Sequence, residues 1–165
     1  MTLRPLWTTQ NDLAEKVRRG AIDLLNQQLA DALDLTLQTK QAHWNVKGPN
    51  FIALHELFDE VAKEVGDYAD DLAERAVELG GTALGTARVA AATSRLVEYP
   101  LDISSGRDHV TALSRALATF AKSVRAAIDE AEALGDAGTV DLFTEVSRGV
   151  DKLLWKVEVH AQARD

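Results

Sequence analysis

Apolar residues recur along the chain at three- and four-residue intervals in four long stretches, which is the spacing of amphipathic helices. We expect helices over residues 11–46, about 51–79, from just after 105 to 134, and from about 139 onward. Breakers follow the first three stretches: Gly48-Pro49, Gly80-Gly81 and Gly135. Ser105 and Asp108 also have the spacing of a capping box at the start of the third helix.

One long connection separates the second helix from the third. It covers residues 80–104, whereas connections in helix bundles usually run about 2–8 residues. The other two connections are short, so the helices that they join should be antiparallel neighbours. A single long crossover is typical of ferritin-like bundles, and an up-down-up-down bundle has none. The sequence therefore predicts an all-α, ferritin-like four-helix bundle.

The same pattern predicts how the chain is divided. Residues 83–96 of the crossover are expected to hold a short helix of their own. Residues 11–165 should form a single domain, preceded by a short N-terminal tail over residues 1–10.

Composition narrows the class of protein. The chain has 165 residues, 46% hydrophobic but only 5% aromatic, which favours packed helices over a β-sandwich. The absence of cysteine excludes disulfides and thiolate metal sites. No apolar run approaches the roughly 20 residues of a membrane span, and residues 1–10 lack a secretory apolar segment. We therefore expect a cytoplasmic protein that does not enter a membrane, and its net charge of −8 suits cations better than nucleic acids.

The second predicted helix carries potential metal ligands beside its apolar stripe. At about 100° per residue with Leu54 at zero, the apolar stripe covers roughly 300° to 40°. Potential ligands fall at about 100° to 200°; they are His55, Asp59, Asp70 and Glu74. A small-residue stripe lies at about 60° to 120° and consists of Ala62, Gly66, Ala69 and Ala73. The arc is either a solvated acidic face, as charge runs often are, or a metal-binding face that a helix of a second subunit approaches closely.

The potential ligands cannot converge within one chain. His55 and Asp59 are four residues apart, as are Asp70 and Glu74, so each pair can hold one side of an ion. The two pairs are about 22 Å apart on a continuous helix, while metal–ligand bonds are about 2 Å long. Two antiparallel copies of the helix across a two-fold axis would bring opposite pairs together and form two equivalent sites. His43, near the end of the first helix, should reach the same cluster.

Other chemistries lack their motifs. No histidine has a glutamate three residues before it, so the Glu-x-x-His pairs of core di-iron bundles are missing. The zincin motif, the phosphate-binding loop, the dinucleotide-binding glycine pattern and the Gly-x-Ser-x-Gly elbow are missing as well.

Several stretches of the chain match the sequence signature of one family. They are residues 40–46 (KQAHWNV) with Gly48, 51–56 (FIALHE), Asp70 with Glu74, 73–81, 99–103 and 151–155. On these stretches the chain resembles the Dps proteins (DNA-binding proteins from starved cells, or mini-ferritins) from about residue 21 to residue 158. The signature is specific, because two histidines twelve positions apart, followed by Asp and Glu at these offsets, rarely arise by chance.

The resemblance implies a ferroxidase and iron store that protects against oxidative damage. Dps proteins are ferritin-like bundles that form hollow dodecamers built on two-fold dimers, with ferroxidase centres between two-fold-related subunits. They oxidise ferrous iron preferentially with hydrogen peroxide and deposit ferric oxide inside the cavity. On this resemblance the metal-binding and catalytic residues are His43, His55 and Asp59 of one subunit with Asp70 and Glu74 of its two-fold mate. The expected cofactor is iron in a dinuclear or mononuclear centre, and zinc, manganese or cobalt suit the same ligands.

Further residues carry weaker expectations. Trp44 is expected in core or interface packing, and the resemblance suggests that it absorbs stray oxidising equivalents. The acidic residues Asp136, Asp141 and Glu145 resemble the family's three-fold pore, but acids near a helix N-terminus are also favourable without any pore. We expect Trp155 in the core, and we expect His109, His160, Asp67 and Asp71 on the surface.

DNA binding is the alternative function, as in a nucleoid-compacting stress protein with secondary iron handling. Family members that condense DNA usually carry a lysine-rich tail, whereas residues 1–10 contain only Arg4 and the terminal amine. Lys16, Arg18 and Arg19 fall on the first helix, and Arg164 lies beside an acid. Nonspecific affinity depends on many Lys or Arg contacts to phosphate, so we expect weak or no DNA binding. A purely structural helical assembly would leave the small-residue stripe beside the acids unexplained.

Overall fold

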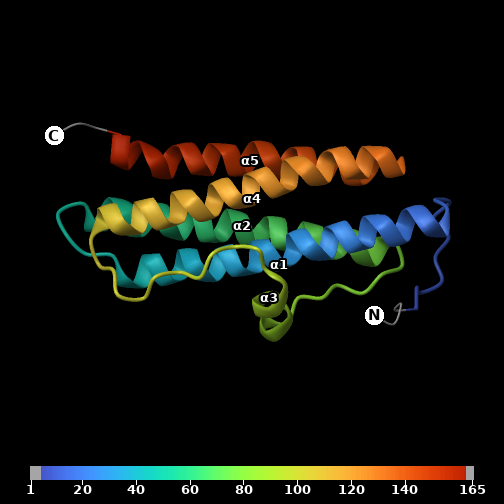
Figure 1. Cartoon of the computed structure of the whole chain (residues 1–165), viewed down its shortest axis with the longest axis horizontal. Coiled ribbons are helices and arrows are strands. Elements are labelled where there is room, and N and C mark those ends of the chain that lie inside the picture. The colour runs from blue at the N-terminus through green and yellow to red at the C-terminus, as the bar shows by residue number, and fades with distance from the viewer. Residues whose placement is uncertain (1–4, 163–165) are drawn as a thin grey trace.

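Four long helices pack side by side, and one connection returns along the length of the bundle (Figure 1). The computed structural model describes residues 5–162, so the parts of the tail and of the C-terminus at 1–4 and 163–165 lie outside the described residues. The helices are α1 (Glu15–Asn45), α2 (Phe51–Glu78), α3 (Ala87–Thr93), α4 (Gly106–Leu134) and α5 (Ala137–Gln162). The expected all-α bundle with one long crossover is confirmed, and the short helix in the crossover is α3.

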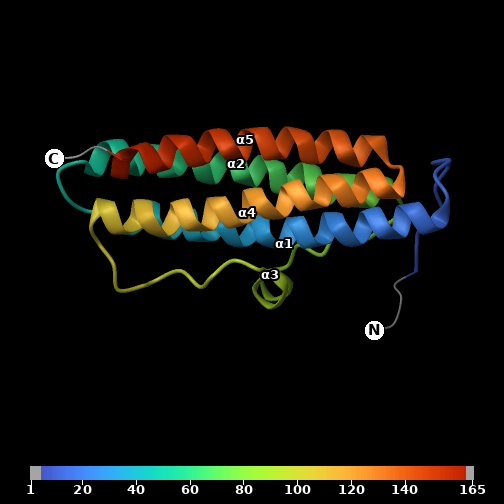
Figure 2. The same ribbon diagram turned by 45° about the horizontal axis from the view of Figure 1, so that its top comes forward.

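The connections fix the directions of the helices. The pairs α1–α2 and α4–α5 are antiparallel hairpins, while the crossover makes α4 run in the same direction as α2 (Figures 1 and 2). The crossover passes along the outer side of α1, where α3 contacts it (Figure 2). One end of the bundle therefore gathers the end of α1 with the beginnings of α2 and α4. No helix within residues 5–162 has both the length and the apolar character that a membrane crossing requires.

The helices bury one continuous core. Phe58, Phe120 and Phe143 are fully buried among leucines and valines from all four long helices. The expectation for Trp155 was wrong, because its side chain is 59% exposed while Leu153 and Val157 on the opposite face of α5 are buried. His109 was also misplaced, since it is only 1% exposed beneath the crossover. His160, Asp67 and Asp71 are exposed as expected.

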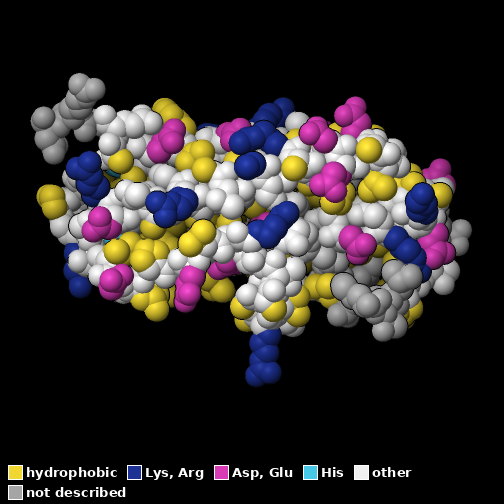
Figure 3. Space-filling model, in the orientation of Figure 1, with side chains coloured by type: hydrophobic (Ala, Val, Ile, Leu, Met, Phe, Trp, Pro, Cys, Tyr) yellow, Lys and Arg dark blue, Asp and Glu magenta, His cyan; other side chains and the backbone are white. Residues whose placement is uncertain are grey.

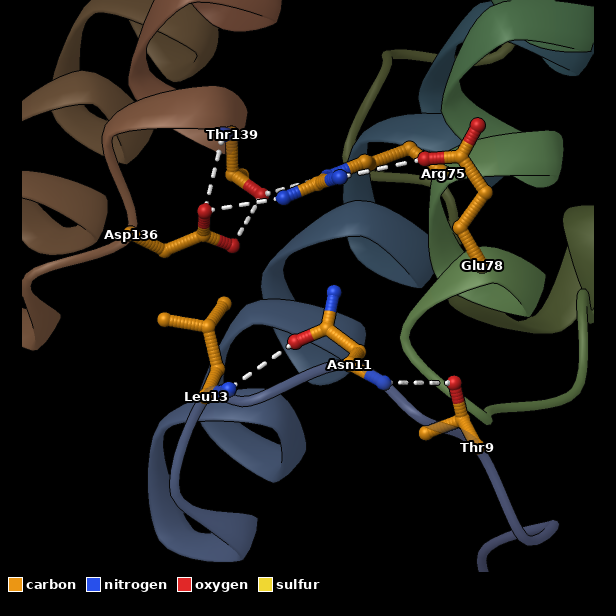
Figure 4. A network of polar contacts seen from close by, with 7 residues as sticks. All are labelled: Thr9, Asn11, Leu13, Arg75, Glu78, Asp136 and Thr139. Atoms are coloured by element: carbon orange, nitrogen blue, oxygen red, sulfur yellow. Dashed lines mark hydrogen bonds and ion pairs between the residues drawn. The ribbon is translucent and has the colours of Figure 1, made fainter.

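The first helix begins later than its sequence pattern predicts. It starts at Glu15 instead of Asn11, because the Asn11 side chain accepts a hydrogen bond from the backbone N–H of Leu13 at 3.0 Å (Figure 4). Such local side-chain bonds hold the backbone in a turn that competes with a helix. The helix ends at Asn45, and Lys47 donates its backbone N–H to Ser104 at 2.9 Å.

Caps define the other helix ends. Ser105 accepts a hydrogen bond from the backbone N–H of Asp108, which confirms the predicted cap of α4. Gly135 ends α4 with a left-handed φ of 83°, a conformation that glycine adopts without strain. Asp136 accepts from the backbone N–H of Thr139 at 3.2 Å and therefore caps α5.

Polar contacts attach the crossover to α1. The carboxylate of Asp31 is buried and accepts both the guanidinium of Arg95 (2.6 Å) and its backbone N–H (2.8 Å). Gln38 donates to the backbone carbonyl of Val97 at 3.1 Å. A segment that buries few of its apolar side chains is therefore held by a buried ion pair and a hydrogen bond to the backbone.

We predict that Gly81→Ala destabilises the junction of α2 and the crossover. A Cβ at this position would lie 2.7 Å from the carbonyl oxygen of Ala76 and 2.8 Å from Cγ2 of Ile22. The backbone must move to relieve this overlap, so the free energy of unfolding should fall by about 1–3 kcal/mol. Urea denaturation at one fixed protein concentration measures the change.

Gly85→Ala is the matched control in the same crossover. Its Cβ would meet no atom closer than the Cδ1 of Leu33 at 3.6 Å, so the free energy of unfolding should change by less than about 0.5 kcal/mol. Equal losses in the two variants would contradict the steric explanation.

Candidate metal centre

Two histidines face each other where α1 and α2 meet. His43 lies near the end of α1 and His55 lies in the second turn of α2, and their rings stack with centroids 3.7 Å apart. Nδ1 of His43 is 2.7 Å from the carbonyl oxygen of His55, and Nδ1 of His55 is 2.8 Å from the carbonyl oxygen of His43. The two side chains therefore join the helices through a reciprocal pair of hydrogen bonds.

These hydrogen bonds determine the tautomer of both rings. A carbonyl oxygen only accepts, so each Nδ1 carries the hydrogen and each Nε2 keeps its lone pair. A backbone carbonyl on the other ring nitrogen is a common second-shell partner of metal-binding histidines, which orients the ring and makes it a better donor. Both imidazoles are thus prepared to bind a metal ion through Nε2.

The third predicted ligand of this group already has a cationic partner. Oδ1 of Asp59 accepts a hydrogen bond from the Lys40 ammonium at 2.6 Å. This hydrogen bond and the charge of Lys40 lower the pKa of Asp59 below its ordinary value. Lys40 was not among the predicted site residues. Its position gave a signal, because it lies one turn before His43 while Asp59 lies one turn after His55 on the antiparallel helix.

The other two predicted ligands lie far along the same helix. Asp70 and Glu74 are exposed on α2, and within residues 5–162 neither makes a hydrogen bond or an ion pair. Because α2 is unbroken from Phe51 to Glu78, about 22 Å of helix separates Asp70 from His55. Within that part of the chain no three His, Asp or Glu side chains come together as a metal site. Within the described chain the predicted ligands therefore lie in two separate groups.

Only part of the small-residue stripe on α2 is buried within the chain. Ala62 and Ala69 are buried inside the chain, so they do not form a free surface, contrary to the sequence interpretation of the whole stripe. Ala73 is half-buried, and a Cβ on Gly66 would meet nothing within 4 Å. Packing within the described chain thus explains the two alanines but not the glycine.

Large apolar side chains surround the histidine pair. The exposed fractions are 65% for Trp44, 61% for Ile52 and 39% for Phe51, whose ring centroid lies 5.1 Å from that of His55. The ring of Trp44 also lies 5.7 Å from the Lys40 ammonium. Trp44 is therefore not in the core of the chain. Clustered exposed apolar residues of this size are typical of contact surfaces between subunits.

The three acids predicted near the start of α5 differ in their surroundings. Asp136 is buried, accepts the Arg75 guanidinium at 2.9 Å and the Thr139 hydroxyl at 2.5 Å, and caps α5 (Figure 4). Asp141 and Glu145 are exposed and have no hydrogen bond or ion pair with the described residues. The role of an acid at a helix N-terminus therefore accounts for Asp136 but not for the other two.

Known proteins resemble the whole chain. Residues 22–164 match the family model of the ferritin-like domain. The DNA protection during starvation protein of Agrobacterium fabrum is 46% identical over 156 residues, which cover 94% of this chain and 96% of that protein. DpsC from Streptomyces coelicolor has a TM-score of 0.93 at 28% identity, covering 100% of this chain and 98% of its own. The structure of Dps from Microbacterium arborescens in the high iron form has a TM-score of 0.85 at 31% identity. That match covers 96% of this chain and 100% of the other.

We predict that Lys40→Gln strengthens divalent metal binding at the histidine pair. The substitution frees the Asp59 carboxylate and removes a positive charge beside the incoming cation. Exposed ion pairs contribute about 0.2–1 kcal/mol, so the affinity for Zn²⁺ or Co²⁺ should rise by up to about fivefold. Calorimetric titration with Zn²⁺ measures the affinity.

Lys63→Gln is the control for a general change of charge. Lys63 pairs with Asp67 at 3.3 Å on the same helix, away from the histidines. Its removal changes the net charge equally but should leave the affinity for Zn²⁺ unchanged. The assignment fails if both variants bind Zn²⁺ equally tightly.

Proposed function

The chain belongs to the Dps family of ferritin-like proteins, and on that premise we propose that it is a ferroxidase and iron store. In this proposal it oxidises ferrous iron with hydrogen peroxide, or with oxygen, at sites shared between two-fold-related subunits. The observation that carries the proposal is the division of ligands along α2, with His55 and Asp59 at one end and Asp70 and Glu74 at the other.

Surface features support the two-fold arrangement. The half-site at the histidines is surrounded by the exposed apolar side chains of Trp44, Phe51 and Ile52. Gly66 lies between the two half-sites, and its missing side chain leaves room for a second helix. An antiparallel α2 from a second copy would place carboxylates at the histidines of the first copy, and the symmetry would repeat the contact. Closed assembly of such dimers into a hollow dodecamer is part of the proposal.

The donor set suits the proposed chemistry. Two imidazoles and three carboxylates form the mixed nitrogen and oxygen environment that iron, zinc, manganese and cobalt accept. Each ferrous ion loses one electron and peroxide takes up two, so two ions are oxidised per peroxide reduced to water. The carboxylates offset the charge that each ion gains. The Lys40 ammonium neutralises Asp59 while no cation is bound and must leave when the cation arrives.

Two assignments from the resemblance remain part of the proposal. Trp44 lies beside the histidine pair and would be an accessible sink for oxidising equivalents. Of the three acids that the resemblance assigns to the pore, Asp141 and Glu145 would line it with exposed carboxylates on the path by which iron reaches the cavity. Asp136 would instead hold the start of α5 in place through its ion pair with Arg75.

We predict that two inactive variants restore activity when they share a dimer. One variant lacks the first pair (His55→Ala with Asp59→Ala), and the other lacks the second (Asp70→Ala with Glu74→Ala). Random mixing makes half of the dimers mixed, and each mixed dimer keeps one intact site of two. Stopped-flow ferrous oxidation with peroxide should therefore recover to about a quarter of the wild-type rate.

The same two variants, assembled separately and combined without subunit exchange, are the control and should stay inactive. Sites confined to one chain would give no recovery in either mixture. That result would overturn the shared centre.

DNA binding is the second candidate, because the curated relative with 46% identity is named for DNA protection. Two basic residues at the start of α1 already have partners within the chain. Arg18 donates to the carbonyl oxygen of Leu79 at 2.9 Å, and Arg19 pairs with Glu15 at 2.7 Å. The segment before α1 is held by a 2.8 Å hydrogen bond from the N–H of Trp7 to Gly80. Lys and Arg alternate with Asp and Glu over the face shown in Figure 3, without a continuous basic band.

We therefore predict no retained DNA complex at physiological salt. Nonspecific binding needs many phosphate contacts, and a net charge of −8 per chain opposes them. A gel-shift assay at low micromolar protein concentration measures binding. A shift that persists at that salt and disappears when residues 1–10 are removed would show that the tail binds DNA.

A further inference from the structure

A tyrosine and a histidine form a buried hydrogen-bonded pair outside the proposed metal centre. Tyr99 lies in the crossover and His109 in the first turns of α4, and the phenol oxygen is 2.6 Å from Nδ1 of the imidazole. The side chains are 7% and 1% exposed. Their ring planes are nearly parallel, with an interplanar angle of 14°. The pair is thus a short, well-shielded contact between two segments of the fold.

Both partners are neutral near neutral pH. Burial raises the pKa of the Tyr99 phenol above its ordinary value. Burial also lowers the pKa of His109, although the backbone of Asn45 and the carboxylate of Asp108 oppose this effect. The Tyr99 hydroxyl has no other acceptor among the described residues. We therefore assign the phenol as the donor to Nδ1, which places the imidazole hydrogen on Nε2. A neutral phenol that donates to a neutral imidazole can release its proton within the hydrogen bond.

The other nitrogen of His109, Nε2, is only weakly satisfied within residues 5–162. It is buried and reaches no hydrogen-bond partner of good geometry there, and the backbone of Asn45 is the one polar group that acts on the ring from that side. Buried polar atoms are rarely left without a partner, and a redox role is one of the explanations when they are. A phenylalanine at position 109 would fill the space without this cost, so packing alone does not explain the choice of histidine.

The pair lies at the same end of the bundle as His43 and His55. The beginning of α4 is fixed there because the N–H of Lys47 bonds to the carbonyl oxygen of Ser104. The backbone of Asn45 lies beside the His109 ring. Asn45 is two residues, or about 3 Å of helix rise, beyond His43. The end of α1 is therefore in contact with both the proposed metal centre and the buried pair.

We propose that Tyr99 and His109 are a redox-active pair that takes up one-electron oxidising equivalents formed at the proposed metal centre at the same end of the bundle, with His109 accepting the phenolic proton. This inference rests on the proposed function, which supplies the ferrous iron and the peroxide. It extends the oxidant sink from the exposed Trp44 to a site that solvent does not reach.

The electrons and protons balance over three steps. One ferrous ion gives an electron to peroxide, which splits into hydroxide and a hydroxyl radical. The hydroxyl radical takes one electron from Tyr99 and becomes hydroxide, while the phenolic proton moves to Nδ1 of His109. A second ferrous ion then returns an electron to Tyr99, and the proton moves back from Nδ1 to the phenol oxygen. Two ferrous ions and one peroxide are consumed, and no hydroxyl radical leaves the protein.

The chain offers a natural control, because Tyr68 is its only other tyrosine. Tyr68 donates to the carboxylate of Glu64 at 2.8 Å and is only partly buried. Its proton acceptor is thus a carboxylate of its own helix and not a shielded imidazole. A tyrosyl radical in this protein therefore belongs to one of two residues, and single substitutions to phenylalanine assign it.

The test is freeze-quench electron paramagnetic resonance of the iron-loaded protein after mixing with peroxide. We expect a tyrosyl signal in the wild type and in Tyr68→Phe, and its loss in Tyr99→Phe. His109→Gln keeps a hydrogen-bonding group but no base, and the signal should be lost there as well. A spin trap in solution should capture more hydroxyl radical from Tyr99→Phe than from the wild type. Thermal unfolding followed by circular dichroism confirms that each variant is folded.

The outcomes separate this inference from the proposed function. Formation of ferric iron in the wild type without any tyrosyl signal, or a signal that survives in Tyr99→Phe, overturns the redox pair and leaves the ferroxidase intact. A wild type that forms no ferric iron contradicts the ferroxidase instead. In that case, photochemical oxidation with a ruthenium tris-bipyridyl complex and persulfate tests the pair without iron. A radical on Tyr99 then supports the pair, and its absence overturns it.

Discussion

The straightness of α2 is the constraint on which the proposed site depends. A helix of 28 residues without a break holds its two ligand pairs about 22 Å apart, and no rotation of side chains closes that distance. In the proposal, catalysis therefore depends on assembly. The two-fold contact that would cover the exposed side chains of Trp44, Phe51 and Ile52 would also complete the ligand set. Within residues 5–162 nothing fills the space beside Gly66, and the proposed dimer would explain it.

The contact between α1 and α2 fixes both histidines of the proposed metal centre in place. Each imidazole is oriented by the backbone of the opposite helix, so neither ring has to lose much rotational freedom when it binds an ion. Lys40 completes this arrangement by balancing the charge of Asp59. The same contact also joins the two helices, which means that the position of the ligands and the packing of the hairpin are determined together.

Much of this arrangement was predictable from the chain itself. Helical periodicity located the long helices, and the fixed rise of a helix showed that a single chain could not complete the metal site. The errors had different causes. His109 lies one turn before the buried Leu113 on α4, so the helical periodicity allowed a buried position there, and the surface assignment followed the residue type instead. Trp155 was assigned to the core from its residue type, although it lies opposite Leu153 and Val157 on α5. The helix α1 begins later than predicted because the Asn11 side chain binds the backbone N–H of Leu13 and so competes locally with the helix.

The two sides of α1 also explain why buried polar groups occur where they do. Towards α2, α1 meets a helix with its own apolar stripe, so apolar packing holds this contact, and the polar residues of the proposed metal centre lie at its edge. On its other side it meets the crossover, a segment whose single short helix buries little apolar surface. That side is held by polar contacts instead, namely the ion pair of Asp31 with Arg95 and the bond from Gln38 to the backbone. Tyr99 lies in this polar layer, and its hydrogen bond reaches across to α4. The crossover is held by polar contacts and also shields them from water. In the proposed redox pair, Tyr99 needs both the shielding and the hydrogen bond, because its proton must stay close by while it loses and regains an electron.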